Sequence, residues 1–376
     1  MRELTSLELH ALIDELRPSI ENGFIRKFYE LSPDSFRFGF YSPESGNTMI
    51  YCKLLVTFNR TVLAESAGEA SDFSMGIRKR IENARVTGIE QHGSDRIIVI
   101  GISAKGSNYS LIIEMFGKGN IILLNEMGIV EQCYRSVTFK DRKIAPRSKY
   151  NFPPSAGIRE VWSAGYADVL AEVRKAANAE KKAMAEVSKG VGIGPLYLED
   201  VFNREGINPK GRIENDRDAE RIAKGIADLL ERMKRPEPLL YTLGGKVLDY
   251  AILPIRKYEQ MGASAKRYKT ISELLDELHS EDRTTVSNEA AEKRIEELKA
   301  NIKKQEELAA RLEKESDEYQ KAGHKIFEMM GEINALIGYL RENRRAEVEE
   351  VRKRFPNLKV KELDLKNKVV KIDIEG

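Results

Sequence analysis

Charged residues with possible acid/base chemistry lie at the breaks between β-rich runs in the stretch 91–125. Asp95 and Arg96 stand at the start of one run, and Lys118 lies in the break before another. Side chains at the ends of rigid strands are held in fixed positions, which is why binding and catalytic residues often lie there. The sequence therefore predicts a small acid/base constellation at these strand ends, and this is the candidate site.

Three β-rich runs would position that constellation. They cover 96–103, 109–116 and 120–125, and Gly-containing polar segments separate them. Runs of this length and composition, with such breaks, are typical of consecutive antiparallel strands. We expect a β-meander at the core of the N-terminal part.

Basic residues with aromatics among them form a second candidate feature. Arg78, Lys79 and Arg80 lie between Ile77 and Ile81 at helical spacing, and the segment 134–150 mixes cations with Tyr and Phe. Charge runs are usually solvated surfaces, but interleaved aromatics favour nucleic-acid contact. Phosphate contacts would give affinity without sequence choice. The candidate RNA-binding side chains are Arg78, Lys79, Arg80, Lys118, Arg135, Lys140, Arg142, Lys143, Arg147 and Lys149.

Composition limits the classes of protein. The 376 residues, 41% of them hydrophobic, suffice for two or three domains. A net charge of +2 with 32% charged residues means that a preference for an acidic partner must come from local patches. Cys52 and Cys133 are the only cysteines, with 4 histidines scattered. We therefore expect no disulfide framework, no metal site and no cofactor. No apolar run is long enough to span a membrane, and a cytoplasmic protein is expected.

The N-terminal elements follow from local patterns. Thr5–Leu16 is predicted to be a helix with Thr5 as N-cap and Glu8 as its capping-box partner, and Pro18 should loosen or end it. The alternation at 36–40 and the run 49–56 predict a hairpin around a turn at 43–47.

The middle of the chain, 156–276, is helical and rich in Ala. Gly190, Gly192 and Gly194, followed by Pro195, predict a tight turn between two helices, a helix-hairpin-helix. Such a turn serves either to bind phosphate or to pack helices, and both remain open. A dinucleotide-binding loop is disfavoured because no strand precedes the glycines. The run 239–253 is either a small hairpin or a buried connection.

A long periodic segment opens at Asn288 and ends before Pro356. Apolar residues at alternating three- and four-residue steps from Ile295 to Leu340 predict a coiled-coil arm, weakened in the middle by Gln305, Ser316 and Gly323. Its partner helix is not in this chain. Residues 358–374 alternate like strands around Asn367, so the chain is expected to be truncated soon after a β-rich element begins.

These motifs, taken in order, resemble the NFACT family. The likeness rests on SLELHALIDELRP, GIEQHGSDRIIVI, LIIEMFGKGNIILLNE, the basic stretch ending in YNFPP, KGVGIGPLYLEDV and the heptad arm, and it covers nearly the whole chain. The resemblance implies an α+β chain with a formamidopyrimidine-DNA-glycosylase-like β-rich domain (1–155), a helix-hairpin-helix domain (156–280), a first coiled-coil helix (281–355) and the start of a middle domain (356–376).

The resemblance also implies a function. Family members are ribosome-associated quality-control factors, which bind large ribosomal subunits obstructed by peptidyl-tRNA and recruit aminoacyl-tRNA for template-free tailing. The tRNA-handling residues carry over to Asp95, Arg96 and Glu8, the last replacing the more usual Asp. We expect these three side chains to meet in one pocket, where opposite charges hold Arg96.

Two alternatives remain beside a non-enzymatic tRNA- and ribosome-binding factor. A glycosylase relative would need a proline amine at position two as nucleophile, and this chain has Arg2 there. A matrix-binding coiled-coil adhesin would need an export signal, and none is recognisable. The arm is expected to pair with a second copy of the chain, because its partner helix is missing.

Overall fold

The computed structural model describes residues 2–62, 70–154, 157–178 and 182–373, without the side chains of 280–295 and 297. The chain forms two compact units, Met1–Thr285 and Val286–Gly376. Asn288 and Ile295 of the predicted arm therefore have side chains outside the described set.

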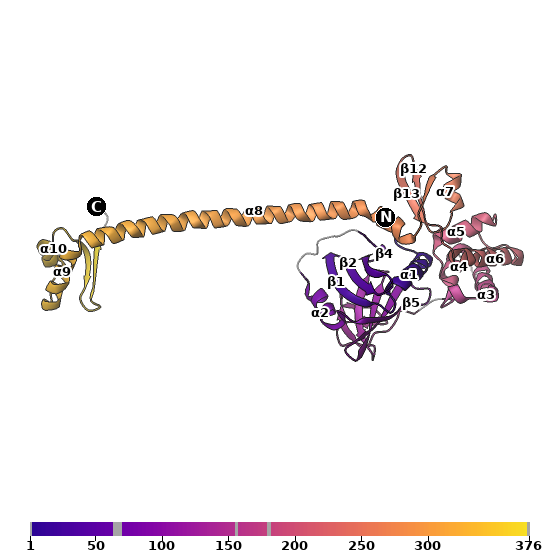
Figure 1. Cartoon of the computed structure of the whole chain (residues 1–376), viewed down its shortest axis with the longest axis horizontal. Coiled ribbons are helices and arrows are strands. Elements are labelled where there is room, and N and C mark those ends of the chain that lie inside the picture. Colours follow the sequence, from indigo (N-terminus) through magenta and orange to yellow (C-terminus); the bar gives the residue numbers. More distant parts are fainter. Residues whose placement is uncertain (1, 63–69, 155–156, 179–181, 374–376) are drawn as a thin grey trace. The chain divides into compact units, whose positions relative to one another are not determined.

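A nine-stranded antiparallel sheet dominates the first unit (Figure 1), in the order β4-β3-β2-β1-β5-β6-β7-β8-β9. The predicted meander is confirmed as β6, β7 and β8, and the predicted hairpin extends to four strands, β1 to β4. The strands are β1 (Phe24–Ser32), β2 (Ser35–Ser42), β3 (Gly46–Lys53), β4 (Thr57–Arg60), β5 (Arg85–Gln91), β6 (Ile97–Ala104), β7 (Ser107–Glu114), β8 (Asn120–Asn125) and β9 (Val130–Cys133). The basic segment after β9 holds only the short pair β10 (Val137–Thr138) and β11 (Lys143–Ile144).

Two helices accompany the strands. The capping box predicted for Thr5 and Glu8 is present at the start of α1 (Ser6–Ile20), whose apolar side chains are buried against the sheet. Of the two effects expected of Pro18, ending the helix is excluded, since α1 continues to Ile20. A proline near the end of a helix removes only one backbone bond, and burial of Ile20 favours the extra residues. α2 (Asp72–Ile81) carries the basic triplet beside β1.

Helices follow the sheet in the same unit. They are η1 (Val161–Ser163), α3 (Tyr166–Ala177), α4 (Ala183–Val191), α5 (Pro195–Arg204), α6 (Asp216–Met233) and α7 (Arg256–Gln260). The open question at 239–253 is settled by a hairpin of β12 (Leu239–Leu243) and β13 (Lys246–Ala251), joined by β14 (Ser264–Arg267). One hydrophobic cluster runs from α1 and the large sheet through α3 to α6. This shared core fixes the helical part against the strands.

The second unit has a small core of its own. The helix α8 (Ile271–Glu328) leads into α9 (Met330–Glu342), α10 (Val348–Arg354), β15 (Lys359–Asp364) and β16 (Val369–Asp373). The prediction of one helix to Phe355 is wrong, because α8 ends at Glu328. Leu336, Ala346, Val351, Leu358 and Val360 are buried together, so the apolar residues after 328 form this core rather than lengthening the arm.

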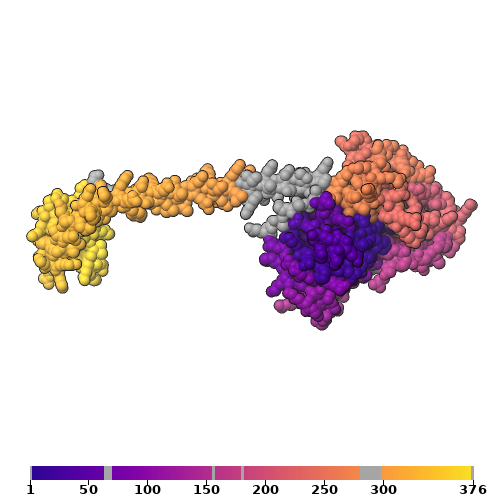
Figure 2. Space-filling model, in the orientation of Figure 1, coloured from indigo at the N-terminus to yellow at the C-terminus, as the bar shows by residue number. Residues whose placement is uncertain are grey.

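The predicted seam of α8 is exposed along its described part. Ile302 is 54% exposed and Tyr319 is 75% exposed. Figure 2 shows this part of the helix as a narrow rod of atoms. The apolar stripe exists, and a coiled-coil pairing of it stays a prediction.

Candidate functional site

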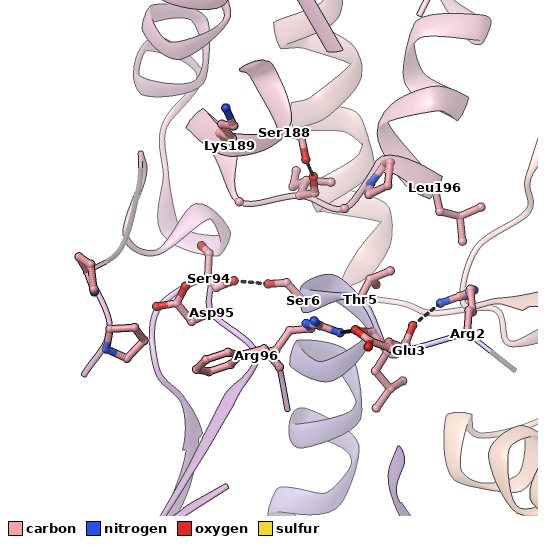
Figure 3. Close-up of a pocket in the computed structure, with 18 residues that line it drawn as sticks. Arg2, Glu3, Thr5, Ser6, Ser94, Asp95, Arg96, Ser188, Lys189 and Leu196 are labelled. Atoms are coloured by element: carbon pink, nitrogen blue, oxygen red, sulfur yellow. Dashed lines mark hydrogen bonds and ion pairs between the residues drawn. The ribbon is translucent and has the colours of Figure 1, made fainter. Parts of the chain in front are cut away.

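A cleft of about 740 Å³ opens in the first unit where five segments meet. One wall holds the residues before α1 and the β5–β6 turn, and the opposite wall holds the turn between α4 and α5 (Figure 3). Phe116, Pro153 and Pro154 also line it. The lining polar side chains are Arg2, Glu3, Thr5, Ser6, Ser94, Asp95, Arg96, Ser188 and Lys189.

Asp95 and Arg96 both line this cleft, as expected for two of the three candidate residues. The charge that holds Arg96 is Glu3, with 2.5 Å between Nη1 and Oε2, and the Leu4 carbonyl accepts a second bond at 3.1 Å. The expectation that Asp95 or Glu8 holds Arg96 is therefore wrong. The guanidinium is fixed by the segment before α1, which leaves the Asp95 carboxylate free for another partner.

The Asp95 carboxylate lacks a protein partner at one oxygen. Its Oδ2 is buried and makes no hydrogen bond, while its backbone carbonyl accepts one from Gln91 Nε2 at 2.8 Å. Burial raises the pKa of Asp95, and the nearby His92 opposes the shift. A partly buried acceptor without a donor is costly. The position is suited to a ligand that brings a hydrogen-bond donor.

The α4–α5 turn reaches the β5–β6 turn because of its glycines. Gly192 ends α4 with φ 68°, and a Cβ built on it would lie 2.6 Å from the Cβ of Ser94. A Cβ on Gly194 would lie 3.3 Å from Thr5 Cγ2. A larger residue at Gly192 would push the walls apart and strain a left-handed backbone. The glycine turn is thus a close-packing corner that forms one wall of the cleft.

Hydrogen bonds of Ser94 fix the β5–β6 turn from two sides. Its carbonyl accepts a bond from Ser6 Oγ, and its hydroxyl receives the Val161 N–H at 3.1 Å and donates to the Arg159 carbonyl at 3.2 Å. The turn that carries Asp95 is therefore anchored to α1 and to the segment before η1. Its side chains are presented on a rigid support.

Glu8 does not lie in the cleft, contrary to expectation. Its side chain is 0% exposed, and its carboxylate bonds both Nη atoms of Arg2, at 2.8 and 2.5 Å. The Tyr197 hydroxyl donates to Oε1 at 2.8 Å, and the Thr5 N–H donates to Oε2 at 2.8 Å. Both oxygens of the Glu8 carboxylate thus accept hydrogen bonds from groups within the protein. The capping box turns this side chain back toward Thr5 and away from the cleft.

Arg2 connects that buried acid to the small sheet. Its Nε bonds Asp249 Oδ1 at 2.8 Å, its Nη2 bonds the Tyr250 carbonyl at 2.7 Å, and its guanidinium lies 4.0 Å from the centre of the Tyr250 ring. Burial, followed by the charge of Glu8, raises the pKa of Tyr197. The network holds the residues before α1, and with them Glu3, in place at the cleft.

The candidate RNA-binding cations divide into three groups. Lys79, Lys118, Lys140, Lys143, Arg147 and Lys149 are exposed. Arg78, Arg80 and Arg135 are half-buried; Arg80 pairs with Glu131, and Arg135 pairs with Asp34 and bonds the Lys118 carbonyl. The prediction that Arg142 faces RNA is wrong, because its side chain is 5% exposed and bonds Glu114 at 2.6 Å. Tyr150 shares that carboxylate, so Arg142 closes a small core instead of facing a ligand.

Sequence reasoning missed several residues of this site. Arg2, Ser94 and Lys189 line the cleft, yet their neighbours in sequence give no pattern that points to it. The one usable signal was the glycine turn, whose packing partner becomes visible only in three dimensions.

Two kinds of feature are absent from the part of the chain that the structure describes. No group of three or more His, Cys, Asp or Glu side chains there is placed to hold a metal ion. No described helix is both long and apolar enough to cross a membrane.

The α+β fold is shared with solved protein structures. The fibrinogen binding protein from Staphylococcus aureus matches 73% of this chain and 98% of its own, with a TM-score of 0.60 and 18% identity. The N-terminal part of the fibronectin/fibrinogen-binding protein from Streptococcus suis matches with a TM-score of 0.58 and 19% identity. Identities this low establish the fold alone. The family model for NFACT N-terminal and middle domains matches residues 5–362, and the chain belongs to this family.

Curated relatives carry names from ribosome quality control. The archaeal Rqc2 homolog aRqcH of Methanocaldococcus jannaschii is 24% identical over 91% of this chain and 52% of its own length. The Rqc2 homolog RqcH of Bacillus subtilis is 24% identical over 72% of this chain and 46% of its own. The chain thus spans about half the length of these relatives.

Proposed function

We propose that the chain is a ribosome-associated quality-control factor. In this role it binds large ribosomal subunits obstructed by peptidyl-tRNA and recruits aminoacyl-tRNA for template-free C-terminal tailing. Support comes from family membership over residues 5–362 and from relatives named as Rqc2 homologs. A cytoplasmic location follows from a ribosomal partner.

The cleft is the observation that carries the tRNA part of the proposal. It places the Arg96 guanidinium and the buried, partnerless Oδ2 of Asp95 on one wall, opposite the α4–α5 turn, where the Lys189 amine pairs with Glu186. RNA offers phosphates to the cations and base or amino donors to the carboxylate. Glu8 contributes to tRNA handling indirectly, because it holds Arg2 and the segment that carries Glu3. The exposed cations, such as Lys118 and Lys149, add phosphate contacts.

The cleft acts by binding rather than by chemistry in this proposal. Hydroxyls of Ser6, Ser94 and Ser188 bond backbone carbonyls, and none of them is paired with a general base. Nucleophilic catalysis requires such a base within hydrogen-bond reach. We therefore propose that the chain is not an enzyme.

The glycosylase alternative has no support at position two. Catalysis of that type needs an N-terminal secondary amine, whereas Arg2 points into the Glu8 and Asp249 network. A DNA-binding role without catalysis differs from the proposal in its preferred nucleic acid, so the two can be separated by one binding comparison.

Binding measured with the whole chain tests the proposal. We expect tRNA to bind more tightly than a duplex DNA that contains a damaged base, with log affinity falling linearly as log salt rises. Tighter binding to the damaged duplex would overturn the tRNA assignment. A flat salt dependence would contradict a phosphate-binding site.

A further inference from the structure

The outer face of β1 and β2 carries aromatic and basic residues in facing pairs. Phe24 lies opposite Tyr41, Lys27 opposite Gly39, and Tyr29 opposite Arg37. The alternate positions, including Phe28 and Phe38, point into the core and are at most 1% exposed. Arg26 sits at a bulge in β1, and both it and Lys27 are exposed. This outer face shares no residue with the cleft.

Arginines lie over these aromatic rings in two groups. The Arg26 guanidinium lies 5.6 Å from the centre of the Phe24 ring and 5.3 Å from that of Tyr41. Over Tyr29 lie Arg37, at 5.0 Å, and Arg78, which reaches across from α2 to 4.5 Å. Three planar side chains are thus grouped at each end of the outer face. Bases of single-stranded RNA stack on aromatic rings and on guanidinium planes alike.

The stacked arginines are held in place before any ligand arrives. Arg26 Nη1 donates to Asn83 Oδ1 at 2.8 Å, and Arg78 Nε donates to the Phe28 carbonyl at 2.6 Å. A fixed guanidinium loses little side-chain entropy when a base packs on it. Pre-ordered planes of this kind suit binding more than a mobile surface charge would.

The charge of the outer face selects a polyanion. Its residues on β1 and β2 are Phe24, Arg26, Lys27, Tyr29, Arg37, Gly39 and Tyr41, and none is acidic. Glu30, at the end of β1, accepts a bond from Ser71 of the α2 N-cap and pairs across the strands with inward-facing Phe36. Lys27 stands between the two stacks, which are roughly 15 Å apart along the strand.

We propose that this outer face binds single-stranded RNA. Bases stack on the Arg26 and Tyr29 groups, and a phosphate of the backbone that runs between them contacts Lys27. An acidic peptide would satisfy the charges but would offer no flat rings to the stacks. Duplex RNA would offer phosphates with its bases already paired. Of these three ligands, single-stranded RNA is the one that matches both the charge and the planar groups.

The test measures affinity of the whole chain for a labelled single-stranded RNA of about 12 nucleotides. Arg26→Ala and Tyr41→Leu should each weaken binding roughly tenfold, whereas Tyr41→Phe should bind as the unchanged chain does, because the ring is kept. Lys246→Ala, which removes an exposed cation from β13, is the matched control and should have no comparable effect. Lys27→Ala, at an exposed position, should lower the salt dependence without a folding defect.

Competition experiments distinguish single-stranded RNA from the other ligands that the outer face could bind. Unchanged affinity in Arg26→Ala and Lys27→Ala would overturn the inference, as would equal binding of duplex RNA or displacement by polyglutamate at equal charge. Asp95→Ala with Arg96→Ala should leave this binding intact while impairing tRNA. If the cleft variant loses tRNA binding and the outer-face variants bind single-stranded RNA as the unchanged chain does, this inference is refuted. The proposed function is then still supported.

Discussion

Arg2 and Glu8 form the ion pair that holds the segment before α1, and Arg2 also lines the cleft. Arg2 is bound by Glu8, Asp249 and the Tyr250 carbonyl, and Glu8 is wholly buried. A buried charge that loses its partner is strongly destabilising. The acid at position 8 is therefore expected to act through stability and through the placement of Glu3.

Glu8→Ala should lower the free energy of unfolding by about 3 kcal/mol, because it removes one of the two carboxylate partners of Arg2, leaves the buried Tyr197 hydroxyl without its acceptor and removes the capping-box partner. Asp14→Ala, on the exposed side of the same helix, is the control and should cost roughly 0.5 kcal/mol. Urea unfolding measures both. A fully stable Glu8→Ala protein that fails to bind tRNA would instead mean direct contact.

Asp95 should destabilise the protein at neutral pH. Its pKa in the folded state is raised by burial, so ionisation is disfavoured in the folded chain relative to the unfolded one, and the penalty is present above the folded pKa. Asp95→Asn should therefore stabilise the chain by roughly 0.5 kcal/mol at pH 7. The gain should vanish as the pH falls below the ordinary Asp value, where both forms are neutral. Thermal melts at both pH values check this, and a gain independent of pH would refute the electrostatic cause.

The elements show which features local sequence can predict. The strands β6 to β8, the α1 cap and the basic helix α2 follow from alternation, capping and periodicity, and all are present. The pairing of β1 with β5, which joins the two halves of the sheet, and the approach of Gly192 to Ser94 depend on contacts between distant residues. That is why Asp95 and Arg96 could be predicted while Arg2, Glu3 and Lys189 could not.

The helix α8 illustrates a different limit. Periodicity continues beyond its end, since Ile333 and Leu340 keep the seam spacing, yet both pack against the small core of the second unit. Spacing alone does not distinguish a longer arm from a new helix that turns back. The burial of Leu336 shows that the second of these, a new helix, is present.

We predict that the exposed stripe of α8 makes the chain self-associate. Leu298, Ile302 and Leu312 are each about half exposed, and burying each is worth roughly 1.5 to 3 kcal/mol. An antiparallel two-fold dimer would cover the stripe, loosely, because Gln305 and Ser316 interrupt it. Light scattering over a concentration series should show a dimer that dissociates on dilution. Ile302→Glu with Leu312→Glu should stay monomeric, and an unchanged chain that is monomeric throughout, with a helical arm, would contradict the prediction.

The first unit as a whole connects its strands and helices through one core, and the cleft lies where the two meet. Its walls come from residues nearly two hundred positions apart in sequence, held by the Ser94 bonds and the glycine turn. Such a support lets small polar side chains act on a large ligand with little reorganisation. The function proposed for the chain therefore depends on the cleft walls.

The affinity of the whole chain for aminoacyl-tRNA, with and without Asp95→Ala and Arg96→Ala, tests the central claim most directly. Both residues lie at the cleft surface, so the double variant should keep its fold by circular dichroism and melting temperature. Its affinity should fall at least about tenfold, since charge-assisted hydrogen bonds are lost, while the Lys246→Ala control binds normally. A correctly folded double variant that binds aminoacyl-tRNA as tightly as the unchanged chain would contradict the account.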